Sequence, residues 1–183
     1  RKSFNRLLNM ADHLDLACVG YIIVGAPFQD PDQSVEDLLY LWRRGVLAGV
    51  SAHNPDNIKQ IADEGWENDL FMTCFYYLTR TPAQLQKMAP AKTLQVGHYS
   101  FFESDPLRMT EVARQVDQPC LGFKILGAGR RCGSPRAVRE AFQFAFEHLK
   151  PTDGVIVGMY PYFQDQVGEN AEHARQCAAS RET

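Results

Sequence analysis

Apolar runs and amphipathic segments alternate along the chain. The amphipathic segments repeat apolar residues at the three- and four-residue spacing of a helix, as in the set Val35, Leu38, Leu39 and Trp42. This spacing predicts helices at Lys2–Leu14, from Ser34 to Gly45, after each of Asn54, Thr81, Asp105 and Ser134, and at Gln164–Ala178. The short apolar runs between them predict five strands, at Val19–Val24, Leu47–Ser51, Leu70–Leu78, Cys120–Leu126 and Gly154–Met159.

Four of the predicted helices begin with a small polar residue followed by proline. These pairs are Asn54–Pro55, Thr81–Pro82, Asp105–Pro106 and Ser134–Pro135. The polar side chain accepts a hydrogen bond from a free N–H group of the first helical turn, and proline at the first helical position needs no donor. We therefore expect each of these four polar residues to cap its helix.

The order of the elements predicts the fold class. Strands that are almost continuously apolar, with a helix between each pair, indicate an α/β protein whose parallel sheet is covered on both faces. The alternation alone leaves two architectures open, an open doubly wound sheet and a (β/α)8 barrel. A complete barrel takes about 250 residues, so residues 1–183 are expected to form one domain with about five strand–helix units.

Charge and composition narrow the classes of partner. A net charge of −3 with a pI near 6.0 argues against nucleic acid as the main partner, because proteins that bind nucleic acid usually carry a basic patch. The one basic cluster, Arg130–Arg131, is predicted to be a solvated loop. No apolar run reaches the roughly 18–20 residues that span a bilayer. The five cysteines form no C-x-x-C pair and show no metal-ligand spacing. We expect a cytoplasmic protein that binds a small molecule and has no nucleic-acid, membrane or metal partner.

Two residues that follow predicted strands are candidates for catalysis. In either architecture the ligand site lies at the carboxyl ends of the strands. Lys124 stands in the apolar run Leu121–Leu126, where an ammonium is costly to bury unless it is paired or functional. It is a candidate to hold a phosphate or carboxylate or to form a Schiff base, and the alternative is a lysine that reaches solvent along the helix-facing side. His53 is a candidate base or donor to a carbonyl group, and the alternative is a loop histidine beside Asn54.

Three stretches resemble the C-terminal half of the aldo/keto reductase superfamily. Gly49–Asn54 resembles the motif at strand five of that family, and Lys124–Gly129 resembles the segment that follows strand seven. Val155–Met159, with Gln166–Asn170 behind it, resembles strand eight and the next helix. Their order and spacing agree from about Val19 to the last helix. The resemblance implies the last five strand–helix units of a (β/α)8 barrel, with strands in sequential order, and favours this over the open sheet.

The same resemblance implies an NAD(P)H-linked oxidoreductase that acts on a small carbonyl or sugar-like substrate. It implies that Ser51 and Asn54 hold the nicotinamide and that Gly127 and Gly129 border the pyrophosphate. The adenosine end is assigned to Gln166, Glu169 and Asn170.

The chain departs from the family at several of these positions. Ala52 stands where the family has an asparagine, and Gln166 replaces the arginine that pairs with a 2′-phosphate, which leaves the choice of NAD or NADP open. Gly25 stands where the catalytic histidine closes strand four, and the other catalytic residues of the family come from strands one to three. We therefore expect these 183 residues to contribute cofactor binding without carbonyl reduction of their own.

Two other functions remain open. One is a lyase or aldolase in which Lys124 forms a Schiff base and His53 shuttles the proton. The other is a barrel relative that binds a small ligand without catalysis.

Overall fold

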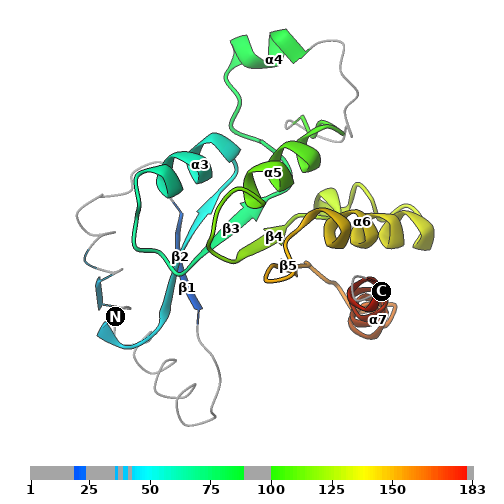
Figure 1. Ribbon diagram of the computed structural model, residues 1–183. Coiled ribbons are helices and arrows are strands. Elements are labelled where there is room, and N and C mark those ends of the chain that lie inside the picture. Colours follow the sequence, from blue (N-terminus) through cyan, green and yellow to red (C-terminus); the bar gives the residue numbers. More distant parts are fainter. Residues whose placement is uncertain (1–18, 24–35, 37–38, 41–42, 89–99, 181–183) are drawn as a thin grey trace.

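The computed structural model describes residues 19–23, 36, 39–40, 43–88 and 100–180. Its centre is a parallel sheet of five strands that lie in sequence order (Figure 1). The strands are β1 (Val19–Ile23), β2 (Leu47–Ala52), β3 (Leu70–Cys74), β4 (Cys120–Phe123) and β5 (Gly154–Ile156). The predicted α/β class, the parallel strands and their sequential order are confirmed. The helix predicted at Lys2–Leu14 lies outside the described residues, and half of the helix predicted from Ser34 to Gly45 is described, with residues 36, 39, 40 and 43 helical.

Five further α-helices of the described residues follow the strands, and all but α4 pack against the sheet or against a neighbouring helix. They are α3 (Pro55–Asp63), α4 (Pro82–Met88), α5 (Asp105–Ala113), α6 (Pro135–His148) and α7 (Gln166–Ala179). α3 and α5 lie beside each other against β2 and β3, α6 follows them along the same side, and α7 packs on α6 (Figure 1). α4 has no buried residue and stands away from the sheet. Within the described part of the chain, no helix combines the length and apolar character that a membrane span requires.

The two faces of the sheet carry different side chains. Partners in a parallel ladder point to the same face, and neighbours along one strand point to opposite faces. Val50, Phe71 and Cys120 are in register, and Cys120 meets Ala113 of α5, so this row faces the helices. Ser51 and Met72 form the next row and therefore face away from the helices. Both rows are buried at β2 and β3, and Leu121, which continues the second row in β4, is partly buried.

Three strands, β3, β4 and β5, end earlier than predicted, whereas β2 extends one residue further, to Ala52. β3 ends at Cys74 where Leu78 was predicted, because the amide of Tyr77 donates to the Asp105 carboxylate (3.2 Å) and not to a neighbouring strand. β4 ends at Phe123 because Lys124 has a left-handed backbone with φ 60°, which a strand cannot contain. The apolar runs therefore continue past the strands into the loops that form the site.

Three of the four predicted caps are confirmed. The side chains of Asn54, Thr81 and Ser134 accept hydrogen bonds from amides in the first turns of α3, α4 and α6. The prediction for Asp105 is wrong, because Ser104 occupies the cap position of α5 and Asp105 is the first helical residue. Its carboxylate turns instead toward the guanidinium of Arg80, which needs a counter-charge where it is buried.

Candidate functional site

His53 and Lys124 come together at the carboxyl end of the sheet. His53 follows β2 and Lys124 follows β4, and both are half-buried. The ring of Phe123 lies beside both, 5.6 Å from the His53 ring and 5.8 Å from the Lys124 ammonium. Burial, and next the positive charge of Lys124, lower the pKa of His53. The imidazole is therefore neutral at pH 7, with one nitrogen able to donate and the other to accept a hydrogen bond.

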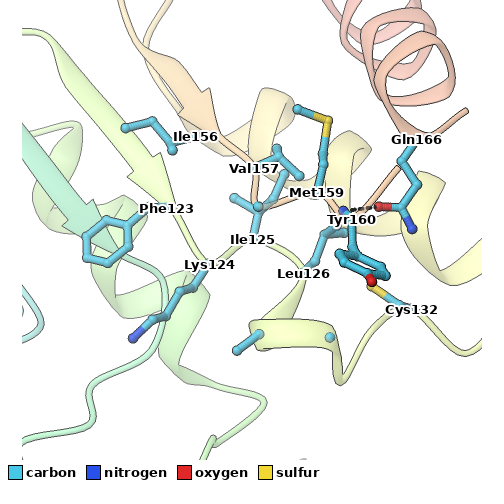
Figure 2. Close-up of a pocket in the computed structure, with 13 residues that line it drawn as sticks. Phe123, Lys124, Ile125, Leu126, Cys132, Ile156, Val157, Met159, Tyr160 and Gln166 are labelled. Carbon is cyan, nitrogen blue, oxygen red and sulfur yellow. Dashed lines mark hydrogen bonds between the residues drawn. The ribbon is translucent and has the colours of Figure 1, made fainter. Parts of the chain in front are cut away.

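The Lys124 side chain is held in an unusual way. A left-handed backbone costs a residue with a Cβ atom roughly 1–2 kcal/mol, and Lys124 adopts it with φ 60°. Among the described residues, no hydrogen bond or ion pair engages its ammonium, whose neighbours are Phe123 and His53. Figure 2 shows the side chain extending past Phe123 and away from Gln166. The two predicted catalytic residues thus share one location.

A cavity of about 560 Å³ lies between the carboxyl ends of β4 and β5 (Figure 2). Pockets for small ligands span about 300–1,000 Å³ and are mostly apolar with a few polar groups. Lys124, Gly129 and Gln166 line it with apolar side chains such as Leu126 and Met159. Three residues predicted from separate stretches of sequence therefore border one cavity.

The loop between β4 and α6 contains a left-handed turn. Gly127, Ala128 and Gly129 have φ values of 58°, 51° and 87°. The amides of Gly127 and Gly129 donate to the carbonyl oxygens of Lys124 (2.8 Å) and Leu126 (3.1 Å), so they are already used within the loop. A pyrophosphate could therefore approach Gly129 because this residue has no side chain, and not because its N–H group is free to donate. Gly127 is buried against the Tyr76 hydroxyl and does not border the cavity.

The other predicted cofactor residues lie outside the cavity wall. Ser51 is buried on the face of the sheet away from the helices. Asn54 caps α3, and its amide also donates to Asn57. Glu169 accepts a hydrogen bond from Gln164, and Asn170 is half-buried on α7. Their roles toward a cofactor remain predictions.

Tyr76 and Arg131 form a contact that the sequence did not indicate. The Nε atom of Arg131 donates to the Tyr76 hydroxyl (3.0 Å), which joins the end of β3 to the loop after β4. Burial raises the pKa of Tyr76, and the charge of Arg131 opposes that shift. The guanidinium of Arg130 stacks on Phe101 at 3.8 Å. Arg130 and Arg131 lie in a loop, as predicted, but both are half-buried and contact Phe101 and Tyr76, so they are not fully solvated.

The Cys74 thiol at the end of β3 is not activated as a nucleophile. Burial raises the pKa of Cys74 to about 11, so its thiol stays protonated at pH 7. Throughout the described ranges, no group of three or more His, Cys, Asp or Glu side chains is placed to hold a metal ion.

Comparisons with protein-family models and with curated proteins give no match to this chain.

Proposed function

We propose that the chain is the C-terminal part of a (β/α)8 barrel oxidoreductase that binds NAD(P)H and reduces a small carbonyl compound, as the resemblance to the aldo/keto reductases implies. The cavity carries this proposal, because Lys124, Gly129 and Gln166 meet at its wall. The loops after the last two strands of such barrels are a frequent site for phosphate groups. Five parallel strands in sequence order are compatible with the barrel.

The cavity wall fits a nucleotide in part. Tyr160 and Met159 offer apolar surface to a planar base, and Gly129 leaves room for a phosphate close to the backbone. The Gln166 carbonyl oxygen accepts a hydrogen bond from the Tyr160 amide (2.7 Å), which fixes that part of the wall. A bound nicotinamide would supply the hydride for reduction. The chain's own His53 and Lys124 lie toward β2 and β3, where they would polarise and orient a carbonyl group.

Gln166→Glu is expected to weaken NADPH binding about tenfold, which corresponds to roughly 1.4 kcal/mol. The new carboxylate keeps the acceptor for the Tyr160 amide but places a negative charge on the cavity wall, where it would repel the phosphates. Titration of the protein with NADPH, followed by nucleotide fluorescence, measures this. Gln115→Glu makes the same change at an exposed site at the other end of the sheet and should leave the affinity unaltered.

Asn170→Ala tests the adenosine end in the same titration and should also weaken binding. Unaltered affinity in both Gln166→Glu and Asn170→Ala would remove the cofactor assignment, as would the lack of any binding by the parent protein at millimolar NADPH.

A second candidate function is a Schiff-base lyase or aldolase, and the proximity of Lys124 to His53 favours it. A neutral imidazole beside an amine is suited to move the proton while an imine forms. Borohydride treatment with pyruvate would then attach the reduced adduct to Lys124, as seen by mass spectrometry of peptides. Lys124→Arg should abolish the label. A label that persists in that variant, or none in the parent protein, counts against this function.

A further inference from the structure

Positive charge gathers at the carboxyl ends of β3 to β5, although the whole chain carries a net charge of −3. The loops that leave these strands are residues 75–81, 124–134 and 157–165. They contain four basic residues, Arg80, Lys124, Arg130 and Arg131, and one acidic residue, Asp165. Asp165 caps α7 by accepting a hydrogen bond from the Gly168 amide (2.9 Å). A second acid, Glu103, borders a small cavity together with Ile125 and Arg131, and the four basic residues still outnumber these two acids.

The acidic residues at the edges of the sheet and at the start of α5 are already engaged. Asp69 and Asp153 lie at the starts of β3 and β5, where they accept hydrogen bonds from the amides of Ala48 (2.7 Å) and Cys120 (2.8 Å). Asp105 is paired with Arg80, and the exposed fractions of the two side chains are 1% and 4%. None of these three carboxylates pairs with Lys124.

Lys124 differs from the other basic residues of these loops. Arg80 is paired with Asp105, Arg131 donates to Tyr76, and the Arg130 guanidinium covers Phe101. Lys124 is half-buried and borders the cavity, and no hydrogen bond or ion pair engages its ammonium among the residues that the structure describes. A partly buried cation is stabilised by an anion that pairs with it. The left-handed backbone of Lys124 adds a cost of the kind that accumulates at functional sites.

We infer that Lys124 binds the anionic group, a carboxylate or a phosphate, of the small carbonyl substrate, with the neutral His53 beside it. The inference rests on the proposed function and adds the class of substrate. The side chain extends past Phe123 and away from Gln166, so it addresses the part of the site nearest β2 and β3 and not the part assigned to the nucleotide (Figure 2). Lys124 is then a specificity-determining residue, and His53 is placed to donate a hydrogen bond to the carbonyl oxygen.

Calorimetric titration with two pairs of probes tests this. Each pair joins an anionic carbonyl compound to its neutral counterpart, pyruvate with pyruvamide and dihydroxyacetone phosphate with dihydroxyacetone. We expect at least one anion to bind ten or more times more tightly than its counterpart, and the better pair identifies a carboxylate or a phosphate. Lys124→Gln should abolish this preference, and Lys124→Arg should keep most of it. Lys59→Gln is the control, because Lys59 is exposed and paired with Asp63.

The outcomes separate this inference from the cofactor assignment. The preference for the anion is measured in the absence of NADPH, so its presence or absence does not depend on whether the cofactor binds. A preference for the anion in a protein that fails to bind NADPH would remove the proposed reductase and keep Lys124 as an anion site. Equal binding of anionic and neutral probes overturns the inference. So does an anion preference that survives Lys124→Gln, or a Lys124→Gln effect confined to NADPH.

Discussion

Asp105→Ala is expected to lower the free energy of unfolding by about 3–5 kcal/mol, the usual cost when one partner of a buried ion pair is removed. Arg80 donates to both carboxylate oxygens of Asp105, and neither side chain is exposed beyond 4%. The guanidinium also donates to the Tyr77 carbonyl oxygen (2.8 Å) and lies over the Tyr77 and Phe102 rings. Without Asp105 this cation would remain buried with no counter-charge.

Urea denaturation followed by circular dichroism measures the effect, and Asp56→Ala is the matched control. Asp56 pairs with Arg108 on the surface, where the side chains are 63% and 46% exposed, so its removal should cost at most about 1 kcal/mol. Similar losses in the two variants would show that the buried pair contributes no more than an exposed one. The double variant Arg80→Met with Asp105→Ala should recover part of the loss, because it removes the unpaired charge.

The strands and helices were predictable because each apolar run is long enough to form a buried strand and each helix repeats its apolar residues at helical spacing, whereas the sequential order of the strands was an expectation from the resemblance. The ends of the strands were not predictable. Nothing in the run Cys120–Leu126 signals that Lys124 adopts a left-handed backbone. Local composition favours an extended strand there, and the conformation follows from the turn at Gly127 that the loop forms with Tyr76.

The candidate site was predictable in part, because ligand sites of parallel α/β proteins lie at the carboxyl ends of the strands. That rule, with the resemblance, selected Lys124, Gly129 and Gln166, which all border the cavity. The contact between Tyr76 and Arg131 joins residues 55 positions apart, and neither residue has a local pattern that would identify the other. Asp105 has the local pattern of a helix cap, and only the tertiary position of Arg80 redirects its carboxylate.

The packing of the sheet against α6 depends on the lack of a side chain at Gly122 of β4. A Cβ atom at this position would lie 2.7 Å from the edge of the Phe75 ring and 3.3 Å from the Leu149 side chain. Phe75 is 1% exposed and meets Phe144 of α6 edge to face, so its ring has little freedom to turn. The space at Gly122 is therefore already occupied by Phe75.

Gly122→Val is accordingly expected to lower the free energy of unfolding by about 3 kcal/mol, and Gly122→Ala by about 1 kcal/mol, within the range for overpacked cores. A cavity of about 40 Å³ borders Phe75 and Phe144, which allows the small shift that alanine needs but not the two methyl groups of valine. Gly133→Ala, at a glycine with open space around it, should change stability by less than about 0.5 kcal/mol.

Phe75→Leu combined with Gly122→Ala should lower the free energy of unfolding by less than the sum of the single changes, because the leucine side chain leaves room for the new methyl group. Strict additivity in urea denaturation would show that Phe75 does not limit the space at Gly122.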